Sequence, residues 1–202
     1  MFENFFITNA VKRGRKLGWI KEITMLSLPN ALELLELYVA SGKNLEEPAQ
    51  KKMFKLPNAR KLVETYIASG GCLRHSFHLY LFELRHAREL VRLYISKGKC
   101  LSYAAQLKML ELPNAGELVE LYISHACNEC YACGSCLCDK AQLKMLNLPT
   151  AQDLVAEYIA KGYRLCEEAQ MELFKFPNAN ELIAEYEVQG WYLCEEAKRK
   201  ML

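Results

Sequence analysis

A row of glycines recurs through the chain at an almost fixed interval. The row consists of Gly14, Gly42, Gly70, Gly98, Gly134, Gly162 and Gly190, with successive spacings of 28, 28, 28, 36, 28 and 28 residues. A fixed period of this length is typical of stacked short units, because each unit buries its apolar face only against its neighbours. The period therefore predicts a repeat fold. The single longer spacing marks where a function is to be sought.

Each unit contains two amphipathic segments. Aligned on the glycines, the first reads L-P-N-A-x-E-L-V-x-x-Y-I-x-x-G and the second reads x-x-L-x-x-x-A-Q-x-x-M-F/L-x. The apolar residues of the first segment share one helical face, as shown by Ala31, Leu34, Leu35, Tyr38 and Val39. We therefore predict an all-α solenoid without strands, built from about six to seven helix–turn–helix units or about 13–14 helices, with the end units as caps.

Proline and glycine predict where these helices begin and end. Proline fixes φ near the helical value and needs no amide partner, so the recurrent proline is predicted to be the first helical residue. These prolines are Pro29, Pro57, Pro113, Pro149 and Pro177. The glycine suits a left-handed position just after a helix, followed by about two linking residues. The second helix of the first complete unit is then expected over about Leu45–Lys55, with Ala49, Met53 and Phe54 facing inward.

Two polar or partly polar side chains recur at fixed positions of the unit. A tyrosine lies within the apolar stripe of each first helix, and we expect these rings in the core. They are Tyr38, Tyr66, Tyr94, Tyr122, Tyr158 and Tyr186. A glutamine flanks the inward positions of the second helix at Gln50, Gln106, Gln142 and Gln170. For the glutamines two alternatives stay open, a face that contacts a partner and a solvated surface.

Composition and charge limit the classes of function. The 26 lysines and arginines nearly balance the 24 acidic residues, so we do not expect nucleic acid as a partner. A basic group near the N-terminus, Lys12–Lys21, and an acidic excess over residues 151–202 are interpreted as solvated surfaces. The chain shows neither a signal peptide nor about 18 consecutive apolar residues, so we expect a cytoplasmic protein with no membrane partner. Its nine cysteines then favour reduced thiols or metal ligands over a disulfide framework.

The paired helices of this short unit resemble, in architecture, the helical-repeat solenoids with short units, specifically HEAT-like repeats and the variant leucine-rich repeat. The resemblance covers nearly the whole chain. It implies a single repeat domain over residues 1–202 that binds protein partners along an extended surface, and it carries over no catalytic residue. Mitochondrial-terminator-type repeats also place a proline between short helices and bind nucleic acid, but the near-neutral charge speaks against that function here.

The larger break in the repeat is the insertion A-C-N-E-C-Y-A-C at residues 126–133. It crowds five cysteines together: Cys127, Cys130, Cys133, Cys136 and Cys138. The last two occupy positions where other units also carry cysteine, whereas the first three are unique to the insertion. Two successive C-x2-C steps place three thiolates around one loop, so we consider a metal site whose remaining ligand is Cys136, Cys138 or His125.

Zinc fits this pattern better than an iron–sulfur cluster. The bacterial ferredoxin pattern continues with x3 and Cys-Pro, whereas here the next cysteine follows after two residues and no proline accompanies it. A reduced loop without metal and a local disulfide stay open as alternatives. Equivalent positions of packed helices lie about 8–10 Å apart, which is too far for a disulfide, so Cys138, Cys166 and Cys194 are predicted to be free thiols.

A smaller break begins at Gly71 and contains three of the four histidines. Cys72, His75 and His78 are weighed as a second metal site, but we favour variation on a surface that contacts a partner. In the same unit Arg85-His86 replaces the usual Pro-Asn. Without the proline, the joint between the two helices is predicted to be looser or nearly continuous.

The chain lacks the sequence patterns of common enzyme classes. It has no nucleophile elbow, phosphate loop, dinucleotide fingerprint or H-E-x-x-H motif. We therefore expect no enzymatic activity and predict a protein-interaction scaffold. The alternative is a metal-binding or redox-sensing protein that uses the Cys127–Cys138 loop, with zinc ahead of iron–sulfur.

Overall fold

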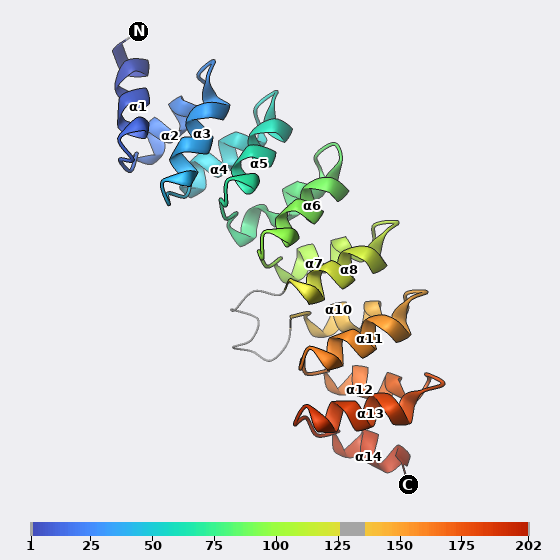
Figure 1. Ribbon diagram of the computed structural model, residues 1–202. Coiled ribbons are helices and arrows are strands. Elements are labelled where there is room, and N and C mark those ends of the chain that lie inside the picture. The colour runs from blue at the N-terminus through green and yellow to red at the C-terminus, as the bar shows by residue number, and fades with distance from the viewer. Residues whose placement is uncertain (1, 126–135, 202) are drawn as a thin grey trace. The chain divides into compact units, whose positions relative to one another are not determined.

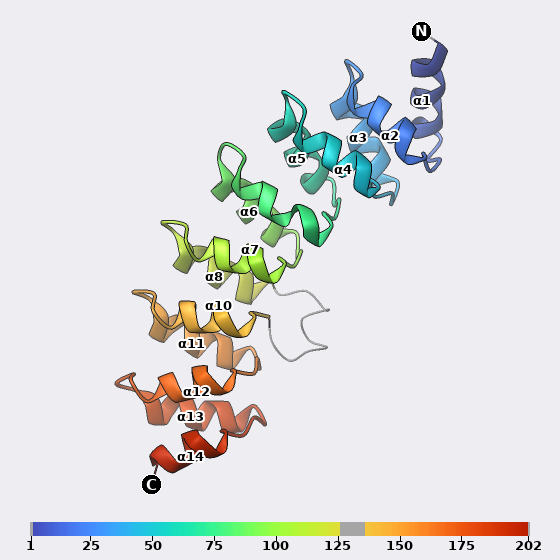
Figure 2. The same ribbon diagram turned by 180° about the vertical axis from the view of Figure 1, so that it is seen from behind.

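The computed structural model describes residues 2–125 and 136–201, which form 13 α-helices, one 3₁₀-helix and no strand. The predicted all-α class is thus confirmed. The helices group into two compact units, Met1–Lys97 and Gly98–Leu202. Within each unit consecutive helices alternate between two layers, and Figures 1 and 2 show these layers from opposite sides. The prediction of one domain over residues 1–202 stays a prediction.

The first compact unit, Met1–Lys97, has four described helices in its first layer and three in its second. The first layer packs in chain order: α1 (Phe2–Lys12), α3 (Ala31–Ala40), α5 (Ala59–Ala68) and α6 (Ala87–Ser96). The second layer contains α2 (Trp19–Leu26), α4 (Glu47–Phe54) and the 3₁₀-helix η1 (His75–Phe82). Each second-layer helix also packs on the first-layer helix that follows it in the chain.

The second unit repeats this arrangement. Its first layer contains α8 (Ala115–Ser124), α11 (Ala151–Ala160) and α13 (Ala179–Val188). Its second layer contains α7 (Tyr103–Met109), α10 (Asp139–Met145), α12 (Glu167–Leu173) and α14 (Glu195–Met201). None of the helices in the described part of the chain is both long enough and apolar enough to cross a membrane.

The core lies between the two layers and follows the predicted apolar stripe. In α3, the five residues of the stripe (Ala31, Leu34, Leu35, Tyr38 and Val39) are all buried. The same positions are buried in α5, α8 and α11. Each large apolar side chain removed from water in this way contributes about 1.5–3 kcal/mol, so packing between layers is the main source of stability for helices this short.

The glycine row ends the first-layer helices as predicted. The six members that the structure describes have φ between +62° and +97°, and Gly134 lies outside the described residues. After α5, the Gly70 N–H donates to the Ile67 carbonyl (2.9 Å) and the Gly71 N–H to the Tyr66 carbonyl (2.8 Å). These two bonds form a Schellman motif, which needs a left-handed residue and satisfies carbonyls that the helix end leaves open.

The first-layer helices begin two residues after the prolines rather than at them. Helix α3 begins at Ala31, and Pro29 is the second residue of a turn in which the Ala31 N–H donates to the Leu28 carbonyl (3.1 Å). Asn30 follows with φ −102° and ψ 27°, as expected for the third residue of a type I turn. The prediction of a helix-initiating proline was wrong because the same φ suits this turn position equally well.

The link between the two helices of a unit is longer than predicted. Helix α4 spans Glu47–Phe54 rather than Leu45–Lys55, so six residues separate it from the end of α3. Leu45 is nevertheless buried, within the link rather than within the helix. Ala49 and Met53 face inward as predicted, whereas Phe54 is only half-buried.

The joint at Arg85-His86 is a turn and not a continuous helix. Helix α6 begins at Ala87, and His86 precedes it with φ +62° and ψ 42°. The alternative of a nearly continuous joint was therefore wrong, and the looser joint stays a prediction. The chain keeps the turn after losing proline and asparagine by placing a histidine in the left-handed region, which costs a residue with a side chain about 1–2 kcal/mol.

Replacement of His86 by glycine tests this strain. We expect His86→Gly to raise the free energy of unfolding by about 0.5–1 kcal/mol, because glycine adopts φ near +62° without a steric penalty. The control is Asn58→Gly at the equivalent position, where φ is −101° and glycine only adds freedom to the unfolded chain. Urea denaturation should show a higher free energy of unfolding than wild type for His86→Gly and a lower one for Asn58→Gly. A loss of stability in both would contradict the assignment of strain to His86.

Candidate functional site

Six buried polar side chains form a row with the same period as the glycines. They are Glu22, Gln50, His78, Gln106, Gln142 and Gln170, and each is at most 3% exposed. They lie on six successive second-layer helices, whereas the last helix, α14, carries the exposed Lys198 at this position. The prediction that the glutamines line a partner surface or a solvated surface was therefore wrong, since these residues lie in the interior.

Gln50 shows how the row is used. Its Nε2 lies within hydrogen-bonding distance of the Leu45 carbonyl (3.0 Å), the Cys72 carbonyl (3.1 Å) and the Tyr66 hydroxyl (3.3 Å). Its Oε1 accepts a hydrogen bond from the Arg74 N–H (2.9 Å). One side chain thus joins the link before its own helix to the link of the next unit. We call this pair of residues, a second-layer polar side chain and the tyrosine of the next first-layer helix, a clamp.

The tyrosine completes the clamp. The Leu45 N–H donates to the Tyr66 hydroxyl (3.3 Å), and that hydroxyl donates in turn to the Cys72 carbonyl (3.0 Å). Burial raises the pKa of Tyr66, so the hydroxyl keeps its proton and can donate. The predicted place of the tyrosines in the core is confirmed, and their hydroxyls also satisfy backbone groups.

Three clamps in the second unit repeat this geometry. The distances from glutamine Nε2 to tyrosine hydroxyl are 3.2, 3.3 and 3.3 Å for Gln106–Tyr122, Gln142–Tyr158 and Gln170–Tyr186. Each glutamine Oε1 accepts from a backbone N–H of the next link, at Cys138 (2.8 Å), Cys166 (2.7 Å) and Cys194 (2.7 Å). The recurring cysteines therefore stand where the backbone is fixed by the clamp.

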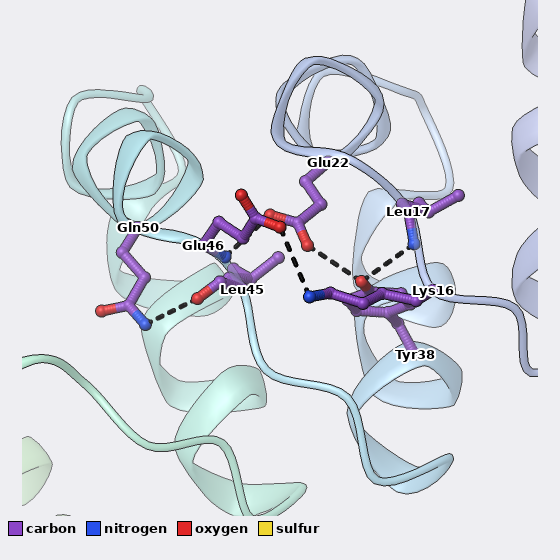
Figure 3. A network of polar contacts seen from close by, with 7 residues as sticks. All are labelled: Lys16, Leu17, Glu22, Tyr38, Leu45, Glu46 and Gln50. Atoms are coloured by element: carbon purple, nitrogen blue, oxygen red, sulfur yellow. Dashed lines mark hydrogen bonds and ion pairs between the residues drawn. The ribbon is translucent and has the colours of Figure 1, made fainter.

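Two clamps in the first unit contain an ionisable residue in place of glutamine. In the first (Figure 3), Glu22 accepts hydrogen bonds from the Tyr38 hydroxyl (2.9 Å) and from the Glu46 N–H (2.8 Å). The Leu17 N–H donates to the same tyrosine (3.1 Å), and Lys16 lies 3.6 Å from the Glu46 carboxylate. Burial raises the pKa of Glu22, and the two donated hydrogen bonds lower it in part.

The second ionisable clamp is His78 with Tyr94. The His78 Nε2 lies 3.0 Å from the Tyr94 hydroxyl and 3.1 Å from the Leu73 carbonyl. Burial lowers the pKa of His78 to about 4, an effect that the neighbouring His75 reinforces and the Leu73 carbonyl opposes. His78 is thus neutral at physiological pH and fills a structural position.

Cys72, His75 and His78 lie near one another without forming a metal site. The two histidine ring centroids are 5.2 Å apart, and the Tyr94 hydroxyl lies between the Cys72 thiol (3.8 Å) and His78 Nε2 (3.0 Å). Among the described residues, no group of three or more histidine, cysteine, aspartate and glutamate side chains is arranged to hold a metal ion.

The predicted metal loop falls largely outside the described residues. Cys127, Cys130 and Cys133 are not described, so the zinc prediction stays a prediction. Cys136 is buried, and Cys138 is half-buried and a free thiol. The prediction of free thiols at Cys138, Cys166 and Cys194 is confirmed. Cys100 differs, because it takes part in a disulfide.

An apolar hollow lies between α4 and η1 in the first compact unit. Three aromatic rings wall a hollow of about 190 Å³, with centroid distances of 6.1 Å for Phe54–Phe77, 5.5 Å for Phe54–Tyr80 and 6.0 Å for Phe77–Tyr80. Phe77 is 4% exposed, whereas Tyr80 is 38% exposed and faces the hollow from its rim. We call this hollow the aromatic pocket, and the described residues that line it are Lys51, Phe54, Lys55, Phe77, Tyr80 and Glu83.

A second hollow, in the second unit, is polar. It has a volume of about 390 Å³ and is lined in part by Arg164, Cys166, Glu167 and Glu168. Burial raises the pKa of the Cys166 thiol, and the charge of nearby Asp139 adds to this effect. The thiol is therefore protonated at neutral pH, which disfavours a role as nucleophile.

These contacts define an all-α helical-repeat protein in which polar clamps join successive units. Comparisons with models of protein families, with curated proteins and with solved structures find no match. The structure thus supports the fold class and leaves the type of repeat open.

Removal of one clamp hydroxyl should be costly. Tyr66→Phe leaves the buried Leu45 N–H without its acceptor, and we expect a loss of about 1–3 kcal/mol in the free energy of unfolding. The control is Tyr103→Phe, because Tyr103 is 74% exposed and its hydroxyl is hydrated. Chemical denaturation should place this control within about 0.5 kcal/mol of wild type. Equal, small effects of both changes would show that the clamp contributes little.

The His78 clamp should make stability depend on pH. An unfolded histidine titrates near 6.5, whereas His78 in the fold titrates at about 4, so between these values only the unfolded chain binds the proton. Stability is therefore lost as the pH falls from about 6.5 to about 4, by about 3 kcal/mol in total from this residue. His78→Gln should remove this loss, and Gln50→His should add a similar one. Thermal melts of the three proteins across this range measure it, and parallel curves would refute it.

Proposed function

We propose that this protein is a non-catalytic interaction scaffold built from helical repeats, of the short-unit HEAT-like or variant leucine-rich type. The paired helices in two layers and the recurrent motif support this class. A repeat of this kind presents a long surface on a rigid frame, and its side chains outside the core are available to a partner.

The observation that carries the proposal is the aromatic pocket on the first unit. Its rim residue Tyr80 stands where equivalent residues of other units are Lys52, Lys108, Lys144 or Glu172, all of them ordinary surface residues. The neighbouring Leu79 is 41% exposed and adds a second apolar side chain to this surface. Exposed aromatic side chains beside a concavity are common at interaction sites.

The polar interior supports the same conclusion. The buried polar residues of the clamps are engaged with backbone groups and tyrosine hydroxyls, which gives them a structural role. A cytoplasmic location remains a prediction.

Site-specific photo-crosslinking in extracts of the protein's own cells tests the proposal. A photoreactive amino acid is placed singly at four exposed positions, Leu37, Leu79, Tyr103 and Tyr192. We expect a discrete protein adduct from at least one position, and from Leu79 first, that disappears when excess unlabelled chain competes. The absence of any competed adduct at all four positions would contradict the proposed function.

A further inference from the structure

The third 28-residue repeat, which contains η1 and lies within the first compact unit, departs from the other repeats where the aromatic pocket forms. At one position of the second-layer helix five other repeats carry alanine, at Ala49, Ala105, Ala141, Ala169 and Ala197, and α2 carries Lys21, but η1 carries Phe77. Three residues later Tyr80 replaces the usual charged side chain. The alanine position faces the core, so a phenylalanine there must find a larger space. It reaches that space against Phe54, with the two rings stacked at 21°.

The size of the pocket fits one apolar side chain. A cavity of about 150 Å³ lined by apolar groups accepts a benzene molecule, and the aromatic pocket measures about 190 Å³. Its three rings lie within 5.5–6.1 Å of one another, so an inserted ring would meet edges and faces of all three.

The charge around the pocket favours acidic residues on either side of the inserted side chain of the ligand. Lys51 and Lys55 line the pocket against the single carboxylate of Glu83. Residues 51–97, which contain the pocket, carry ten lysines and arginines and three glutamates, a net charge of +7 for this segment. An acidic ligand is therefore attracted over a distance of about a Debye length and meets lysines at the rim.

We propose that the aromatic pocket binds an acidic peptide segment of a partner protein through one aromatic anchor side chain. The anchor occupies the hollow that Phe54, Phe77 and Tyr80 line, and the flanking carboxylates of the segment pair with Lys51 and Lys55. This inference rests on the proposed scaffold function and names the chemistry of its partner.

Fluorescence anisotropy with synthetic peptides tests the proposal. The probe is a labelled heptapeptide of aspartate and glutamate with phenylalanine at its centre, titrated with the full chain at low and high salt. We expect saturable binding that weakens with salt, and a loss of about tenfold or more when alanine replaces the phenylalanine of the peptide. A peptide with lysines in place of the acidic residues should not bind.

Matched variants locate the binding. Tyr80→Lys should weaken the binding about tenfold, whereas Tyr103→Lys, at an exposed tyrosine of the second unit, should leave it unchanged. The double variant Lys51→Glu, Lys55→Glu should abolish binding, whereas Arg60→Glu, Lys61→Glu on α5 makes the same change in net charge away from the pocket and should reduce it only slightly. Circular dichroism checks that each variant is folded. The comparison of the phenylalanine and alanine peptides needs only the wild-type protein, so it tests the anchor independently of the variants.

Three results would overturn the proposal. One is the absence of saturable binding by the acidic peptide, and another is binding that responds equally to pocket variants and controls. The third is displacement of the peptide by oligothymidylate that itself loses affinity in Tyr80→Lys, because the surface would then bind nucleic acid. If the peptide fails while crosslinking at Leu37, Tyr103 or Tyr192 yields a competed adduct, the scaffold function stands and only this inference falls.

Discussion

The fold depends on one recurring set of hydrogen bonds, in which a buried amide and a buried tyrosine hydroxyl hold the backbone between helices. Each second-layer helix has only seven or eight residues, and helices of this length are not stable by themselves in water. Apolar packing supplies most of the stability, but it is not directional. The Gln50–Tyr66 clamp supplies direction, because it fixes the Cys72 carbonyl and the Arg74 N–H of the next link at one distance from its own helix.

The clamp also limits which residues can stand at its polar position. Glutamine has both a donor and an acceptor on one planar group, so it can bind a carbonyl and an N–H together. Glu22 has only acceptors when ionised, and the Tyr38 hydroxyl accordingly donates to it. His78 has a single ring nitrogen facing Tyr94 and the Leu73 carbonyl. The two exceptions therefore preserve the contact with tyrosine and introduce groups whose protonation depends on pH.

The periodic parts of the fold could be predicted from the sequence, and the clamps could not. Glycine after a helix and tyrosine within an apolar stripe each have a local physical reason, which the pattern displays. Gln50 stands beside the stripe, and its burial depends on a hydroxyl 16 residues away and on the backbone of the next unit. The signal that could have identified it is the alignment of Glu22 and His78 with the glutamines at the period of the glycine row.

The proline position and the aromatic pocket show two further limits. Proline has the same φ in a type I turn and at a helix start, so the motif alone could not separate the two positions. We therefore predicted that the helix begins at Pro29, whereas it begins two residues later, at Ala31. Phe77 and Tyr80 could have been singled out as departures from the repeat, because alanine and charged residues occupy those positions elsewhere. That they meet Phe54 around one hollow depends on packing between α4 and η1, which no spacing reveals.

Native-state hydrogen exchange of link amides tests the role of the clamps most directly. The N–H groups of Arg74, Cys138, Cys166 and Cys194 lie in links outside the helices, and each donates to the Oε1 of a clamp glutamine. We predict that these four amides are protected to the same degree as the buried turns of the first-layer helices, because they are released only when neighbouring units separate. Exchange at the rate of an unstructured chain would contradict the account, since the links would then open without disturbing the helices.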